Sequence, residues 1–206
     1  MNRVTVYKGQ EYIRVYPIDS MDYINSGWSL KDTRISVNCE FLFVVEYIVG
    51  VETVLPVAKQ LQEKGYSVVL WLYRRESEKP WFMPENESLL SGFSYTTGTF
   101  SALKHSLNSF SGKGVFLVMP PLHAKDTIAY LRFVSPESKI YTFYVGMMLS
   151  CSNVKGGLQG RSKCDYIFVQ GDQSCDMAKA CNLHEKIVVT GLPRFDKLKG
   201  QKVLKS

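Results

Sequence analysis

From residue 38 onward, short continuous runs of apolar residues alternate with segments whose apolar residues recur at helical spacing. An unbroken apolar run is typical of a strand covered on both faces, and apolar residues three or four positions apart are typical of an amphipathic helix. The alternation predicts an α/β fold with a mostly parallel sheet of roughly five to seven strands and right-handed crossovers. The predicted strands are 41–45, 68–72, 115–119, 140–144, 166–169 and 187–190, and the predicted helices are 54–64, 100–110, 124–134 and 173–182.

Two segments and one proline interrupt this pattern. Residues 74–99 are polar and contain Pro80, Pro84 and Gly92, so we expect a long excursion there rather than a strand. Residues 146–163 are rich in Gly and Ser and predict a loop. Pro56 falls within the first predicted helix. Because proline lacks a backbone N–H and clashes with the preceding turn, we expect Pro56 in the first turn of that helix.

The first 30 residues follow a different pattern. Residues 4–7 and 12–16 predict two short strands around a Gly turn, followed by a short helix that Asp19 caps and Gly27 ends. A unit of two strands buries too little surface to be stable alone, so it must dock onto the main domain or a partner. We therefore divide the chain into a β-hairpin-plus-helix docking module at 1–30, a Rossmann-like domain at 38–198 and a basic tail at 199–206.

The composition fits one sizeable globular domain, with 45% hydrophobic and 21% charged residues in 206. The net charge of +6 comes from basic residues spread along the chain, without a basic stripe interleaved with aromatics, which argues against nucleic-acid binding. No apolar run reaches the ~18 residues of a membrane span, and the N-terminus has no apolar signal-peptide core. We therefore expect a soluble protein made in the cytoplasm, without membrane attachment.

The cysteines and histidines do not predict a metal site. The five cysteines are an odd number without a C-x-x-C pair, which is typical of free thiols in a reducing compartment. The three histidines are isolated in the sequence, and we interpret them as structural or solvent-exposed residues rather than ligands. We expect neither metal nor cofactor. The residues concerned are Cys39, Cys151, Cys164, Cys175, Cys181, His105, His123 and His184.

The most informative motif closes the last predicted strand, where residues 191–196 read Gly-Leu-Pro-Arg-Phe-Asp. Gly191 lets the chain turn sharply off the carboxyl end of the strand, and Pro193 fixes the next step. Arg194 then either pairs with Asp196 or binds a phosphate in the crevice where open α/β sheets bind ligands. The spacing alone leaves both alternatives open.

This motif resembles the G-x-P-R-x-D segment that closes the N-terminal domain of the CDP-glycerol glycerophosphotransferases, two-domain GT-B enzymes that polymerise teichoic-acid chains. Residues 165–168 resemble the strand entry that precedes it, and the resemblance covers roughly residues 38–198. It implies a single GT-B half-domain and a nucleotide-activated polyol or sugar as ligand. The candidate ligand- or phosphate-binding residues that it implies are Gly146, Gly191, Arg194 and Asp196.

The sequence departs from that family at the catalytic base. The family strand that corresponds to 140–144 runs into a His-Gly pair whose His is implicated as the base, but here Val145 precedes Gly146. Valine cannot accept a proton, and Tyr144 is a poor substitute because a phenol has a pKa of about 10. The chain also stops at Ser206, about where the linker to the donor-binding domain would begin. We therefore expect no catalytic residue.

Two function classes follow from these departures. The first is a non-catalytic binding or structural module derived from a GT-B half-domain. The second is a subunit of a glycosyl- or glycerophospho-transferase that needs a second chain for donor binding. Residues 14–17, with Asp19, Tyr23 and Trp28, resemble segments that open small tailed-bacteriophage proteins, which implies incorporation in a virion.

We also expect protein partners, in a homo-oligomer or a larger assembly. A half-domain exposes the loops after its strands, and apolar side chains in such loops usually mark an interface. The candidate interface residues are Trp28, Trp81, Met147, Met148 and Leu149.

Overall fold

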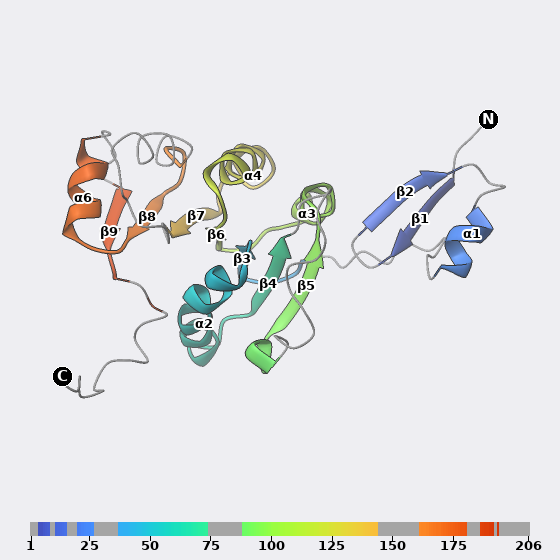
Figure 1. The fold of residues 1–206 in the computed structure, drawn as a ribbon, viewed down its shortest axis with the longest axis horizontal. Coiled ribbons are helices and arrows are strands. Elements are labelled where there is room, and N and C mark those ends of the chain that lie inside the picture. Colours follow the sequence, from blue (N-terminus) through green and yellow to red (C-terminus); the bar gives the residue numbers. More distant parts are fainter. Residues whose placement is uncertain are drawn as a thin grey trace, which may run out of the picture.

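The computed structural model describes residues 4–8, 11–15, 20–26, 37–73, 88–143, 161–180, 186–191 and 193. Its main feature is a seven-stranded parallel sheet flanked by helices, which is a Rossmann-like α/β fold, as the sequence predicts (Figure 1). The strand order is β5-β4-β3-β6-β7-β8-β9. The strands are β3 (Phe41–Val45), β4 (Val68–Tyr73), β5 (Ser94–Gly98), β6 (Gly114–Val118), β7 (Lys139–Phe143), β8 (Tyr166–Val169) and β9 (Ile187–Val189).

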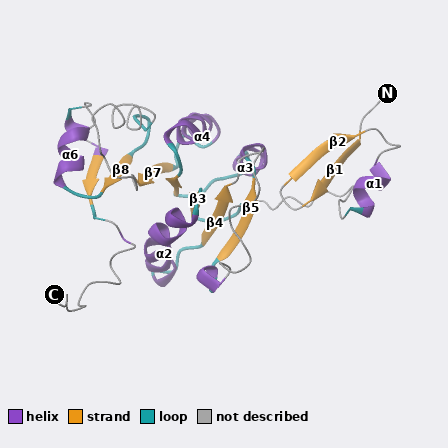
Figure 2. Ribbon diagram, in the orientation of Figure 1, coloured by secondary structure: helices purple, strands orange, loops and turns teal. Residues whose placement is uncertain are grey.

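Helices lie on both faces of this sheet (Figure 2). On one face, α2 (Ile48–Glu63) buries Val51, Val54 and Ala58 against a core that includes Phe43. On the other face, α3 (Phe100–Leu107) and α4 (Pro121–Val134) share a second core with Trp71 and the opposite sides of the same strands. The helix α6 (Asp172–Lys179) follows β8 and joins this second core. The sheet is therefore the middle of three layers.

The strand order reverses between β3 and β6. The chain runs from β3 to β4 and β5 on one side of β3, then returns to β6 and continues through β9 on the other side. Parallel crossovers are right-handed, so a change of direction moves the following helix to the opposite face. The neighbouring strands β3 and β6 are consequently followed by helices on opposite faces, α2 and α4, which Figure 1 shows on either side of the strands.

Two sequence predictions about this domain are wrong. The helix α2 begins at Ile48, so Pro56 lies in its middle rather than in its first turn. The apolar face of α2 is buried on both sides of Pro56, and this burial outweighs the lost hydrogen bond. Residues 94–98, placed in the polar excursion, form the strand β5. This is an edge strand, and Tyr95 is 39% exposed, so it lacks the apolar run of a strand covered on both faces.

The N-terminal residues form two short strands and a short helix, the elements that the sequence predicts. The strands β1 (Val4–Lys8) and β2 (Glu11–Val15) pair antiparallel in a two-stranded sheet of their own. The helix α1 (Ser20–Asn25) follows, and Lys8 Nζ donates a hydrogen bond to the Ser26 carbonyl at 3.0 Å. The predicted cap at Asp19 and the helix stop at Gly27 lie outside the described residues.

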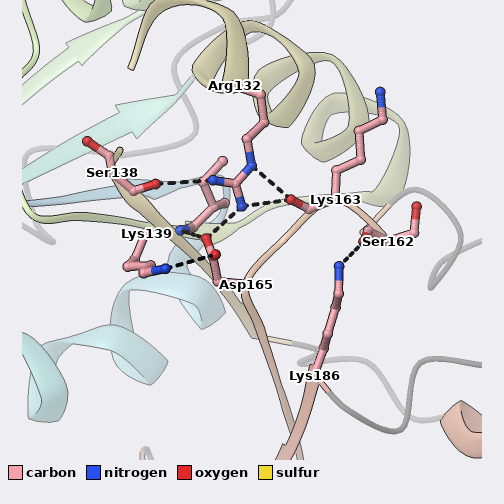
Figure 3. Close-up of polar contacts among 8 residues, drawn as sticks. Arg132, Ser138, Lys139, Ser162, Lys163, Asp165 and Lys186 are labelled. Atoms are coloured by element: carbon pink, nitrogen blue, oxygen red, sulfur yellow. Dashed lines mark hydrogen bonds and ion pairs between the residues drawn. The ribbon is translucent and has the colours of Figure 1, made fainter. Parts of the chain in front are cut away.

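A polar cluster at the amino end of β7 and β8 ties three elements together (Figure 3). The carboxylate of Asp165, just before β8, accepts a hydrogen bond from the Ile140 N–H at 2.7 Å and from Arg132 Nη2 at 2.6 Å. Arg132 comes from the last turn of α4 and also donates to the Lys163 carbonyl at 2.9 Å. One carboxylate therefore joins α4, β7 and the entry to β8.

These contacts determine how Asp165 ionises. Partial burial is the largest single influence and raises the pKa of Asp165. The hydrogen bonds from Ile140 and Arg132, with the nearby charges of Arg132 and Lys139, outweigh it and hold the pKa below its ordinary value. The folded state thus favours the ionised carboxylate, and this contribution to stability is present at neutral pH.

We expect Asp165→Ala to lower the free energy of unfolding by about 2–3 kcal/mol, because it leaves the buried Ile140 N–H and the Arg132 guanidinium without their acceptor. Urea denaturation at pH 7 measures the loss. The matched control is Asp176→Ala, which removes an exposed carboxylate that pairs with Lys179 at 3.2 Å and should change stability by less than about 0.5 kcal/mol. Equal losses in the two variants would contradict this role for Asp165.

The same variant has a signature in acid. Because the folded pKa of Asp165 is lowered, its stabilising contribution should disappear as the pH falls below about 4, through the folded pKa. The difference in unfolding free energy between the wild type and Asp165→Ala should therefore shrink in that range. A difference that is independent of pH from 7 to 3 would argue against an ionised Asp165.

Candidate functional site

The carboxyl ends of β3 and β6 bring a buried carboxylate to the point where the strand order reverses. Successive side chains of a strand face opposite sides of the sheet, and Leu42 and Val44 join the core under α3 and α4. Glu46 continues this alternation, so its side chain lies on the same side. Glu46 is only 2% exposed, and its N–H donates to the Val118 carbonyl of β6 at 2.9 Å.

The carboxylate of Glu46 is paired with His123. The Glu46 Oε2 and His123 Nδ1 atoms are 2.8 Å apart, with exposed fractions of 1% for the Glu46 side chain and 22% for that of His123. His123 lies in the first turn of α4, which begins at Pro121, a favourable first helical residue because it has no N–H to leave unpaired. Thr127 Oγ1 donates to the His123 carbonyl at 2.8 Å, which fixes this turn.

A third strand contributes an aromatic wall. Tyr73 ends β4 and is 5% exposed, and its ring centroid is 5.5 Å from that of His123. The strands β4, β3 and β6 are neighbours in the sheet. One edge of the sheet therefore brings together three residues that follow or end different strands and are far apart in the sequence, Glu46, Tyr73 and His123. Open α/β sheets bind their ligands at such an edge.

The backbone at this edge is strained. Tyr47, between β3 and α2, has φ 77° and ψ 151°, a conformation that residues other than glycine rarely adopt. Three residues later Gly50 allows α2 to lie close to the sheet, since a Cβ there would be 2.7 Å from Val45 Cγ1 and 3.1 Å from Val118 Cγ1. Such strain persists only where the surrounding structure imposes it, and it concentrates at functional sites.

This turn is unlike a dinucleotide-binding turn. A G-x-G-x-x-G turn brings glycine backbone against a pyrophosphate at the helix N-terminus. Here residues 46–50 read Glu-Tyr-Ile-Val-Gly, so only the last glycine is present. The site therefore disfavours NAD-like ligands on α2.

A buried cation lies farther along the same edge. Arg161 is 3% exposed, and it donates from Nε to Thr142 Oγ1 at 3.0 Å and from Nη2 to the Met119 carbonyl at 2.9 Å. These contacts hold the segment before β8 against the ends of β6 and β7. Nearby, burial is the dominant influence on Cys164 and raises its pKa to about 12, although Arg161 acts in the opposite direction. The Cys164 thiol is therefore no nucleophile at neutral pH.

The motif found in the sequence is described only in part. Gly191 follows β9 with φ 73°, the left-handed conformation that the predicted sharp turn requires. Its role in ligand binding stays a prediction. The other candidates lie outside the described residues, and their roles stay predictions too; they are Gly146, Arg194, Asp196, Trp28, Trp81, Met147, Met148 and Leu149, together with Val145.

The pair of Glu46 and His123 was not predicted from the sequence, in which His123 is an isolated histidine. Both residues nevertheless follow an apolar strand run. In a parallel sheet, residues that follow neighbouring strands meet at one edge, so the two positions are a detectable signal once β3 and β6 are known to be adjacent. What the sequence does not reveal is that adjacency.

Within the described ranges, no group of three or more His, Cys, Asp or Glu side chains is arranged to hold a metal ion. No helix among these residues is long and apolar enough to cross a membrane.

We expect Tyr47→Gly to be more stable than Tyr47→Ala by about 1 kcal/mol, because both variants remove the same side-chain contacts but only glycine adopts a positive φ without strain. Thermal denaturation of the two variants measures the difference. A Tyr47→Gly variant that is less stable than Tyr47→Ala would show that the backbone of Tyr47 is not strained.

Comparison with models of known protein families gives no match, and no curated protein matches the sequence.

Proposed function

We propose that this chain is a small-molecule-binding domain whose ligand occupies the carboxyl edge of β4, β3 and β6, and that it serves as one half of a group-transfer system. The observation that carries the proposal is the buried Glu46 carboxylate, paired with His123 at 2.8 Å where the strand order reverses. Removing a carboxylate from water costs several kcal/mol, and apolar residues of similar volume would often be at least as stable. A buried pair at this edge is therefore better explained by ligand binding than by stability.

The same pair favours a transferase component over a purely structural module. The sequence resemblance leaves Val145 where the family has its base, and valine cannot accept a proton. His123, oriented by Glu46, is a titratable group at the same edge of the sheet. A nucleotide-activated polyol or sugar, the ligand class that the resemblance implies, would present the hydroxyls of its polyol or sugar part to this edge.

A second candidate function is assembly with other protein subunits, in a homo-oligomer or a virion. Exposed apolar side chains favour it: Phe133 on α4 is 83% exposed, Tyr166 on β8 is 42% exposed and Val188 on β9 is 37% exposed. Tyr166 also stacks on Tyr141 with ring centroids 5.5 Å apart. Exposed apolar surface of this kind often marks a protein interface.

Ligand binding is tested by titrating the protein with CDP-glycerol, UDP-glucose, glycerol, glucose and NAD in a calorimeter. We expect at least one polyol or sugar compound to bind, and NAD not to bind. Glu46→Gln should weaken binding about tenfold or more, since a hydrogen bond to a charged group contributes about 1.5–3 kcal/mol.

The chain offers a matched control for that variant. Glu40 immediately precedes β3 as Glu46 immediately follows it, but Glu40 lies at the opposite end of the strand and pairs with Lys113 at 2.7 Å. Glu40→Gln should bind ligand like the wild type. Equal weakening in both variants, or binding of none of the polyols and sugars, would refute a site at the carboxyl edge.

The assembly function makes a separate prediction. If Phe133 lies in an interface, the protein should form a defined oligomer, alone or with its native neighbours, and Phe133→Lys should dissociate it because a charge would be buried. Light scattering coupled to size exclusion measures the mass. Lys125→Ala, which changes an exposed residue of the same helix, is the control. An oligomer that Phe133→Lys leaves intact would exclude Phe133 from the contact.

A further inference from the structure

We propose that the site takes a neutral, hydroxyl-bearing ligand, a polyol or a sugar, and that a ligand hydroxyl donates its hydrogen to Nε2 of His123, with Glu46 as the positioning residue. This inference rests on the proposed function and specifies the ligand class of the same site.

The pair of Glu46 and His123 determines which ring nitrogen accepts. An ionised carboxylate can only accept hydrogen bonds, so with Glu46 in that state the 2.8 Å contact between Glu46 Oε2 and His123 Nδ1 places the hydrogen on Nδ1. In a neutral imidazole the other nitrogen, Nε2, then carries a lone pair and no hydrogen. Nε2 is therefore an acceptor, and it needs a donor such as a hydroxyl.

The burial of Glu46 and His123 determines from which side a ligand can reach Nε2. The Glu46 side chain is 1% exposed, whereas that of His123 is 22% exposed. The contact with Glu46 occupies the Nδ1 side of the ring, and part of the His123 side chain is exposed. Within the described part of the chain, Nε2 has no hydrogen-bond partner, while Nδ1 and the His123 carbonyl are both bonded. Nε2 is therefore the ring nitrogen left for a ligand.

The carboxylate beside the ring disfavours an anion at Nε2, although the buried Arg161 guanidinium lies farther along the same edge. The Glu46 carboxylate lies on the far side of the same ring, in a buried setting where its field is weakly screened. A phosphate or carboxylate at Nε2 would meet both that negative charge and a lone pair. The N-terminal end of α4 favours a negative ligand, but the charge of Glu46 opposes it. A neutral hydroxyl satisfies the lone pair without this repulsion.

The surrounding side chains suit a hydroxylated carbon skeleton. The Tyr73 ring lies 5.5 Å from the His123 ring at an interplanar angle of 42°, and Tyr47 is 40% exposed on the adjoining turn. Aromatic faces pack against the C–H surface of a polyol or sugar while its hydroxyls find polar partners. Such a wall contributes little to the binding of a small anion.

The test is ¹⁵N NMR of histidine-labelled protein at pH 7.5, with the resonances of the three histidines assigned through His123→Gln. In the wild type without ligand we expect Nδ1 of His123 to carry the hydrogen and Nε2 to show the shift of a bare nitrogen. Adding glycerol to saturation should move Nε2 toward the shift of a hydrogen-bonded acceptor, whereas inorganic phosphate at the same concentration should not. A hydrogen on Nε2 in the free protein, or a response to phosphate but not to glycerol, overturns the inference.

Variants test the role of Glu46. In Glu46→Gln, the side-chain amide can donate to Nδ1, so the hydrogen should move at least in part to Nε2 and the glycerol response should fall at least tenfold. Glu40→Gln, at the other end of β3, should behave like the wild type. An unchanged tautomer and response in Glu46→Gln would exclude Glu46 as the positioning residue.

The proposed function and this inference fail differently. Backbone amide shifts at the ends of β3 and β6 report binding by any mode. If glycerol and glucose, or their nucleotide-activated forms, shift those amides but leave Nε2 unmoved, the ligand binds elsewhere at the edge and only the inference is wrong. If none of them shifts any amide there, the proposed function is wrong, and the inference falls with it.

Discussion

The right-handedness of parallel crossovers is the constraint on which this structure depends. Because the chain leaves β3 in one direction and later returns to continue in the other, α2 and α4 must lie on opposite faces of neighbouring strands. The two helices therefore diverge above β3 and β6 and cannot cover the edge between them. Glu46 and His123 lie at this edge, one at the start of each diverging connection. The position of the site follows from topology before any side chain is considered.

The two ends of the sheet use charge in opposite ways. At the amino end, Asp165 joins α4, β7 and β8, and Glu40 forms an exposed pair with Lys113. The charged groups at that end therefore either stabilise the fold or have little effect on its stability. At the carboxyl end, a carboxylate is buried and the backbone of Tyr47 is held in a conformation that costs about 1–3 kcal/mol. The apolar cores on both faces of the sheet offset these unfavourable features. Energetically unfavourable features at one end of a sheet, when the other end is stabilised by hydrogen bonds and ion pairs, are typical of a functional edge.

The strands that are covered on both faces could be predicted from the sequence, because burial on both sides leaves an unbroken apolar run such as residues 41–45 or 115–118. The edge strand β5 could not, since one covered face leaves a polar segment that resembles a loop. Pro56 was misplaced because local propensity was weighed without the tertiary burial of α2. The left-handed turn at Gly191 was predictable from local backbone chemistry. Glu46 and His123 were not, because their relation spans 77 residues and depends on the strand order.

That distance bears on the expectation, drawn from the sequence resemblance, that Val145 stands where a related enzyme would have its base. A sequence motif identifies a residue by its position along the chain. A proton acceptor, in contrast, can come from any part of the chain that lies within reach of the ligand. Val145 follows β7 in the sequence, and β7 is the neighbour of β6 in the sheet, with Leu117 opposite Thr142. Neighbouring strands are about 4.8 Å apart, so groups that follow them can serve the same small ligand. On the function proposed above, His123 after β6 would take the place of the base that the resemblance implies after β7. A valine at position 145 would then argue against a particular reaction geometry, but not against a proton acceptor at this edge.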